Sequence, residues 1–139
     1  MNKHFSRARN TPFFRPPTTV TVDGTAVPIR WDFETAFLFA EYVDRSEDAD
    51  ETFLDTVLSI WYPQIPANRD GALDAAIRFY CGGNAPKEGY YRPVMDPTAE
   101  REEIYLKFLK HYGIDLNRER MHWWIFRRLA EGLDERRPS

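Results

Sequence analysis

Five stretches of the chain place apolar residues three and four positions apart, the spacing that gathers side chains on one face of an α-helix. Asp32 can accept the first N–H groups of a helix that we expect to end at about Arg45. The second should begin in the acidic linker 46–51 and end before the prolines at 63 and 66. The remaining helices are predicted from about 68 to 81, from 97 to 112 and from 118 to 133.

Local signals mark the ends of these later helices. The pair Gly82-Gly83 should stop the third helix, because glycine accepts left-handed backbone angles. Asp96-Pro97 is a start signal for the fourth, which Gly113 closes. Either Asp115 or Asn117 can cap the last helix. Each boundary is therefore expected from neighbouring residues alone.

Residues 18–30 follow a different pattern, with two β-branched runs separated by Asp23-Gly24. This dipeptide supplies the positive φ angles of a tight hairpin turn. Pro28 has no N–H to donate, so the second strand should lie at a sheet edge. A lone hairpin is marginal in water, and we expect this one to pack on the helices or to pair with another chain.

The last predicted helix has an unusually wide apolar arc of about 200°. An arc of this width indicates a helix with neighbours on two sides. His122 falls at its centre, whereas Trp124 falls outside it, among Arg127, Arg128 and Glu131. The pattern therefore predicts a buried histidine beside an exposed tryptophan.

Together these elements predict a mainly α, single-domain bundle of about five helices with an N-terminal β-hairpin. The domain should cover residues 18–133, after a flexible basic arm at 1–17 and before a polar tail at 134–139. An aromatic content of 15% in 139 residues supplies enough apolar area for one core. The expected core includes five side chains that the helical pattern turns inward: Trp61, Phe108, His122, Trp123 and Phe126.

The net charge of −3 conceals an uneven distribution. Residues 1–30 sum to +4, residues 31–74 to −9 and the remainder to +2. Contact with phosphates needs a coherent positive face, so this balance argues against a general nucleic-acid binder. It leaves room for a protein partner with basic helices. In the arm, Phe5, Phe13 and Phe14 are either anchors that become ordered on binding or contacts with the domain's own surface.

No catalytic or metal-binding constellation stands out. The single cysteine, Cys81, has no evident base partner and fits a small apolar residue in a reducing compartment. The three histidines lack zinc-ligand spacing, and the acids at 44–55 lack the pattern of a calcium loop. There is no export signal and no apolar run long enough to cross a membrane. We therefore expect no enzyme activity, no cofactor and no membrane partner.

Two residues of the last helix permit two interpretations each. His122 is most simply a core residue with a hydrogen-bonded ring, and a functional histidine is the alternative. Trp124 can make cation–π contacts at the surface or serve as a binding anchor, since tryptophan and arginine dominate interface hot spots. The candidate partner-binding residues are Trp124 with three arginines near it in the sequence and four acids of the linker: Trp124, Arg120, Arg127, Arg128, Glu47, Asp48, Asp50 and Glu51.

The end of the chain resembles a known family. The run Tyr112-Gly113-Ile114-Asp115-Leu116, the residues His122-Trp123-Trp124 and Phe126, and then Leu129 with Gly132-Leu133 are similar to the C-terminal signature of bacteriophage Gp15 proteins. The hairpin at 20–24 and the helix start at Asp32-Phe33 resemble that family's opening. The likeness covers about residues 18–133, and the arm departs from the family's shorter start.

The resemblance implies a gene in the tail module of a long-tailed phage or prophage, near the tape-measure gene. By analogy it implies a tail assembly chaperone that binds tape-measure and tail-tube proteins in the cytoplasm of the bacterial host. The alternative is a structural virion component, such as a tail-completion or connector protein that remains in the particle. A regulatory or host-directed role and a homo-oligomer also stay open.

Overall fold

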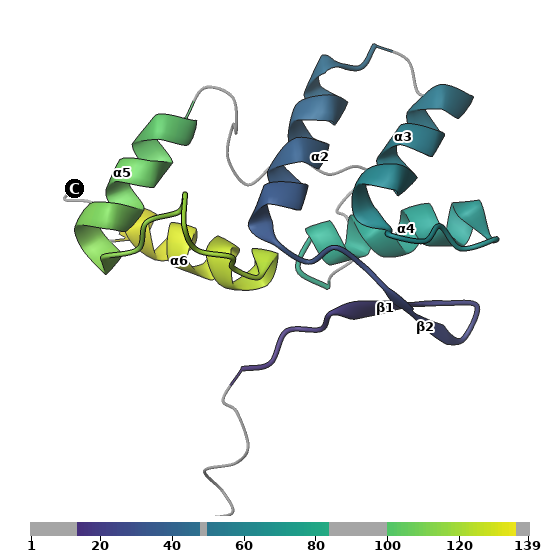
Figure 1. The fold of residues 1–139 in the computed structure, drawn as a ribbon, viewed down its shortest axis with the longest axis horizontal. Helices are drawn as coiled ribbons and strands as arrows, with labels where there is room; N and C mark the ends of the chain where they lie inside the picture. Colours follow the sequence, from purple (N-terminus) through teal and green to yellow (C-terminus); the bar gives the residue numbers. More distant parts are fainter. Residues whose placement is uncertain (1–13, 48–49, 84–99, 136–139) are drawn as a thin grey trace, which may run out of the picture.

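The computed structural model describes residues 14–47, 50–83 and 100–135 (Figure 1). In these ranges the element order is a hairpin followed by five helices, which confirms the predicted mainly α fold. The hairpin strands are β1 (Thr19–Val22) and β2 (Thr25–Pro28). The helices are α2 (Phe33–Arg45), α3 (Glu51–Trp61), α4 (Arg69–Tyr80), α5 (Arg101–Tyr112) and α6 (Trp123–Glu135).

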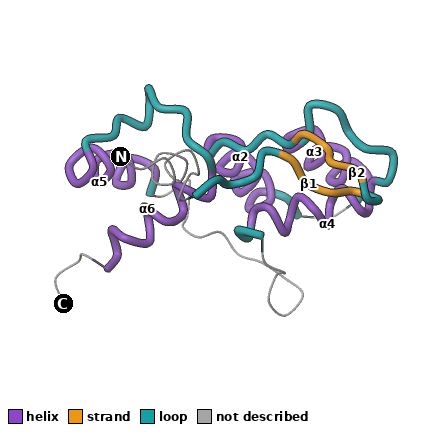
Figure 2. Tube along the Cα trace, turned by 90° about the horizontal axis from the view of Figure 1, so that it is seen from below, coloured by secondary structure: helices purple, strands orange, loops and turns teal. Residues whose placement is uncertain are grey.

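The helices form two groups that share the core (Figure 1). Helices α2 and α3 stand side by side, and α4 crosses at their base above the hairpin. Helices α5 and α6 form the second group, and α6 packs against both α5 and α2. Viewed from below, the hairpin lies over α3 and α4, far from α5 (Figure 2). Helix α2 therefore connects the two groups, together with side-chain contacts between α4 and α6.

Three helices begin where the sequence predicts, because a side chain accepts the N–H groups of the first turn. Asp32 accepts from Thr35 N at 3.1 Å, Asp50 from Phe53 N at 2.9 Å and Asn68 from Gly71 N at 3.0 Å. Each of these side-chain oxygens binds an N–H group that has no backbone acceptor at the start of a helix. At the other end of α4, Gly82 and Gly83 have φ angles of 79° and 93°, which confirms them as the stop signal.

The hairpin forms around Asp23 and Gly24, whose φ angles of 54° and 76° fit the predicted tight turn. Antiparallel pairing runs from Thr19 opposite Pro28 to Val22 opposite Thr25. Val22 is buried where β1 packs on α4. The hairpin therefore packs on the helices, one of the two solutions expected for a strand pair that is unstable alone.

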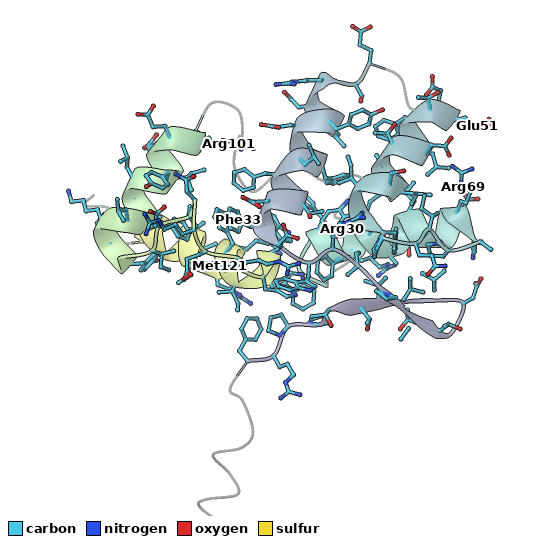
Figure 3. All side chains as sticks on the ribbon, in the orientation of Figure 1. Arg30, Phe33, Glu51, Arg69, Arg101 and Met121 are labelled. Atoms are coloured by element: carbon cyan, nitrogen blue, oxygen red, sulfur yellow. The ribbon has the colours of Figure 1, made fainter. Side chains whose placement is uncertain are left out.

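Two side chains, those of Asn68 and Arg30, join the hairpin end of the molecule to the helices by hydrogen bonds. The amide of Asn68 donates to Asp23 at 2.9 Å, which ties the turn to the start of α4. Arg30, labelled in Figure 3, donates to the carbonyls of Ser59 and Ile60 at 2.8 and 3.2 Å. These carbonyls lie in the last turn of α3, where helical partners are missing. The hairpin and α3 are thus joined through Arg30.

An aromatic core lies where α2, α3, α4 and α6 meet. The ring of Trp123 stacks on Tyr80 with centroids 5.3 Å apart, and its indole N–H donates to Tyr80 O at 2.9 Å. Phe39 contacts the ring of Trp61 at 5.3 Å. All five side chains predicted for the core are buried, with 7% of His122 and at most 2% of the others exposed: Trp61, Phe108, His122, Trp123 and Phe126.

The predicted start of the last helix is wrong, because α6 begins at Trp123 rather than near Arg118. Residues 116–118 form a turn in which Arg118 N donates to Asp115 O at 2.9 Å. The chain then pairs with the segment before α2, where Trp123 N donates to Trp31 O at 2.7 Å. Phe33 N also donates to Met121 O at 3.0 Å, and these bonds between distant segments hold residues 121 and 122 out of the helix.

Other predicted boundaries stand as follows. Helix α5 begins at Arg101, and the expected start at Asp96-Pro97 lies outside the described residues. Gly113, with φ 70°, closes it as predicted. Helix α6 reaches Glu135, two residues into the segment expected as a polar tail. Of the basic arm, the structure describes 14–17.

Candidate functional site

A groove of about 360 Å³ lies between α2 and α5. Its floor is apolar and its rim carries charge, a common arrangement in sites that bind another molecule. Helix α2 supplies Phe33 and Phe37 to the floor, one turn apart. Helix α5 supplies Ile104, and α6 and the loop before it supply the remaining floor residues, Phe126 and Leu116.

The floor is held by stacked rings. The ring of Phe126 stacks on Phe33 at 5.0 Å and on Phe108 at 4.8 Å between ring centroids. Phe37 meets the edge of the same ring at 5.3 Å. Because these side chains come from three helices, the stack fixes the separation of α2 and α5. The groove is thus built into the packing of the core.

The rim combines an ion pair with an exposed leucine. Arg101 lies 3.1 Å from the carboxylate of Glu41 and 5.3 Å from the centroid of Phe37. Glu34 and Leu38 also line the groove, and Leu38 is 53% exposed. Phe33 at the base of α2 and Arg101 at the start of α5 can be found in Figure 3. An exposed leucine beside an apolar floor favours a partner that has an apolar face of its own.

The predicted acidic residues lie at the tips of α2 and α3. Glu47 and Glu51 are exposed, and Glu51 is labelled at the start of α3 in Figure 3. Asp50 is also exposed, although its carboxylate caps α3. Asp48 lies outside the described residues. The three described acids therefore form an accessible negative edge, with Asp50 already engaged in a structural role.

The predicted exposure of Trp124 is wrong. Its indole N–H donates to Phe79 O at 2.8 Å, and its ring lies 5.4 Å from that of Phe79. The end of α4 covers this side of α6, so the ring is half-buried. It is thus a packing residue that keeps only part of its surface accessible.

Two of the three arginines predicted near Trp124 lie beside it. Arg127 and Arg128 line a pocket of about 370 Å³ with Trp124, together with Phe14, Gly82 and Glu131. Arg120 lies over the ring of Trp31 at 4.5 Å. Arg127 is half-buried beside Gly82, and its Nε is a buried donor without a partner among the described residues. Arg128 is exposed and lies 3.7 Å from Glu131. Arg127 and Arg128 therefore share one pocket with Trp124, and Arg120 lies apart from it.

His122 is fully hydrogen-bonded, although it precedes α6 instead of sitting within it. Its Nε2 lies 2.7 Å from the carbonyl oxygen of Pro17, and its Nδ1 accepts from Trp124 N at 2.9 Å. These two partners require the neutral ring with its proton on Nε2. Burial lowers the pKa of His122, which agrees with that state. The ring serves as the side-chain cap of α6.

Groups with reactive chemistry are held in their protonated forms. Burial raises the pKa of the Cys81 thiol, opposed by the positive charge of Arg127, so the nucleophilic thiolate is disfavoured. Burial also raises the pKa of Tyr62 to about 12, and its hydroxyl donates to Ala72 O at 2.7 Å. Within residues 14–47, 50–83 and 100–135, no group of acids, histidines and cysteines is arranged to hold a metal ion. Helices long and apolar enough to span a membrane are likewise lacking in the described ranges.

Sequence reasoning missed the α2/α5 groove. Phe33, Phe37, Ile104 and Phe126 fall on the apolar faces of predicted helices, but that spacing does not reveal that α5 stands apart from α2. The available signal was Leu38, an apolar residue next to the buried stripe of α2. A helix with more apolar surface than its neighbours cover leaves part of that surface open.

A protein-family model described as Bacteriophage Gp15 protein matches residues 16–137, which is most of the chain. No curated protein and no solved structure matches it. The match extends over the hairpin, all five described helices and every residue of the groove.

Proposed function

The chain belongs to the bacteriophage Gp15 protein family, and from this premise we propose that it is a tail assembly chaperone. Family membership indicates a structural or assembly protein of a phage. The narrower role is our proposal: binding of the tape-measure protein and recruitment of tail-tube subunits in the host cytoplasm, without enzymatic activity.

The observation that carries this proposal is the groove between α2 and α5. A helix of 13 residues such as α2 is about 20 Å long, so the groove offers two helical walls to a partner of similar length. An amphipathic helix would cover the apolar floor with its own apolar face and leave its polar face in water. This is the mode of binding expected of a chaperone for a long helical chain.

Charge supports the same partner. Glu34 stands on the groove rim, and Glu47 and Glu51 stand exposed at the helix tips. Such an arrangement attracts basic segments and increases their rate of association. We therefore propose that the bound tape-measure helices carry lysine or arginine on the face that stays in solvent.

The test compares two leucine variants in cells that also produce the tape-measure protein. Leu38→Glu places a charge on the groove rim and should abolish both solubilisation and co-purification of the tape measure. Leu106→Glu is the matched control, because Leu106 is 51% exposed on α5, does not line the groove and should leave binding intact. Circular dichroism should show both variants folded.

Two outcomes would reject the proposal. One is a tape-measure protein that stays insoluble and does not co-purify with the unmodified chain. The other is equal binding by the two glutamate variants, which would remove the groove from the mechanism. The rival role as a virion component has a separate test: mass spectrometry of purified particles should find no copy of a chaperone, whereas a connector or completion protein would be present.

A further inference from the structure

The two strands of the hairpin present different outer edges. Ile29 N donates to Thr18 O at 3.3 Å, which identifies that pair as hydrogen-bonded. Because hydrogen-bonded pairs alternate along an antiparallel ladder, Val20 and Val22 also direct their backbone groups toward β2. Thr19 and Thr21 direct their N–H and C=O groups away from it.

The outer edge of β1 is unpaired. The backbone groups of Thr19 and Thr21 make no hydrogen bond to other described residues, and both threonines are exposed. The corresponding positions of β2 are Ala26 and Pro28, and proline has no N–H to donate. An unpaired strand edge is a template for another strand. In this hairpin only the β1 edge offers a complete set of donors and acceptors.

We propose that this edge pairs with the same edge of a second copy of the chain, in antiparallel orientation about a twofold axis. Two hairpins of two strands would then form one continuous sheet with the order β2-β1-β1-β2. Thr19 of one copy lies opposite Thr21 of the other, and each copy supplies both N–H and C=O groups at both threonines. The proposal is independent of the groove and of the chaperone role.

A second copy fits this edge because Thr19-Val20-Thr21 reads the same in both directions. Antiparallel pairing about Val20 therefore joins chemically identical partners on both sides of the axis, as an isologous interface requires. Val20 would face its own counterpart at a pair without hydrogen bonds, where side chains approach most closely. Val20 is only partly buried in the single chain, so the contact would cover its remaining apolar surface.

The flanking residues confine the pairing to this register. Pro17 has no N–H, and its carbonyl is already bonded to the ring of His122. At the other end, Asp23 belongs to the turn. A shift by two residues would lose one of the two threonine pairs. Pro28 then ends the sheet at both outer edges, so the assembly closes as a dimer instead of growing into a fibre.

The first test uses proline to remove one donor from each edge in turn. Thr21→Pro deletes an outward N–H that the hairpin itself does not use, and Ala26→Pro does the same on β2. A small interface implies weak association, so sedimentation should be followed over a wide concentration series. The unmodified chain and Ala26→Pro should dimerise at the same concentration. Thr21→Pro should need a concentration at least about tenfold higher to reach the same fraction of dimer.

The second test reports the register and does not depend on the stability of the proline variants. In a Cys81→Ala background, Val20→Cys should form a disulfide-linked dimer on oxidation, whereas Val27→Cys, its cross-strand neighbour, should not. A monomer at every concentration, equal effects of the two prolines or equal cross-linking of the two cysteines would each overturn the proposal. Binding of an extended tape-measure peptide at this edge by a monomeric chain would also overturn it.

Discussion

His122 Nε2 lies 2.7 Å from the carbonyl oxygen of Pro17, a residue 105 positions earlier in the chain. The opposite ring nitrogen accepts the N–H of Trp124. One neutral imidazole therefore connects the segment before the hairpin to the first turn of α6. The stacked ring of Trp31, 5.7 Å away, covers one of its faces.

This arrangement predicts acid-sensitive stability. Burial lowers the folded-state pKa of His122 below its ordinary value of 6.5. Above pH 6.5 the ring is neutral in both folded and unfolded chains, and its contribution is complete. As the pH falls below 6.5, the unfolded chain takes up the proton first, so stability is lost progressively through the lower folded-state pKa.

Urea unfolding at a series of pH values measures this loss. In His122→Phe the pH-dependent part should disappear, and the free energy of unfolding at neutral pH should fall by about 1–3 kcal/mol, because two hydrogen bonds are lost. His111→Phe replaces an exposed histidine at the end of α5 and is the control. An unchanged pH profile in His122→Phe would show that the acid sensitivity arises elsewhere.

Truncation of Trp124 should destabilise the fold. Trp124→Ala removes the bond to Phe79 O and leaves a space at the contact between α4 and α6. Full burial of tryptophan is worth about 3–5 kcal/mol on truncation, and we expect about 2–3 kcal/mol for this half-buried ring. Arg128→Ala should change the free energy of unfolding by less than about 1 kcal/mol, because its ion pair is exposed. Equal melting temperatures of the tryptophan variant and the unmodified chain would restore the surface role expected from the sequence.

The difference between local contacts and contacts of distant segments explains which features can be predicted from the sequence. Asp32, Asp50 and Asn68 cap helices through residues three positions away, so their roles can be predicted from local spacing. The start of α6 depends on Trp123 N binding Trp31 O, a contact between distant segments. Helical periodicity near residue 118 therefore gave the wrong boundary.

In the candidate site, too, local spacing is visible in the sequence and the packing of distant segments is not. The apolar faces of α2 and α5 are visible as spacing, but the groove exists because Phe126 of α6 separates them. Trp124 was misplaced for a related reason: helical angles describe a single helix, and they do not include the end of α4 that covers this ring. Which apolar surface stays open is thus a property of the packing.

Asn68 predicts a link between helix capping and the hairpin. It caps α4 through its side-chain oxygen and donates from its nitrogen to Asp23. Asn68→Ala removes both bonds and should lower the free energy of unfolding by about 1–2 kcal/mol. Asn68→Asp keeps the cap of α4, so it should lower the free energy of unfolding by less than Asn68→Ala does. The remaining loss comes from repulsion between two carboxylates and should disappear when Asp23→Asn removes one of them. Additive effects of Asn68→Asp and Asp23→Asn in a double-mutant cycle would contradict this link.

The acidic edge predicts how partner binding depends on salt. In the triple variant Glu47→Gln, Asp50→Asn and Glu51→Gln, the charges are removed while asparagine retains the cap of α3. The unmodified chain should bind a basic tape-measure helix with an association rate that falls steeply as salt increases, because exposed charges steer the encounter and are screened. At low salt the association rate of the triple variant should be about tenfold lower, and at high salt it should equal that of the unmodified chain. The dissociation rate should be the same for both.

Stopped-flow fluorescence with a labelled helix measures both rates. A faster dissociation with an unchanged association rate would place these carboxylates in the bound interface and would reject their steering role.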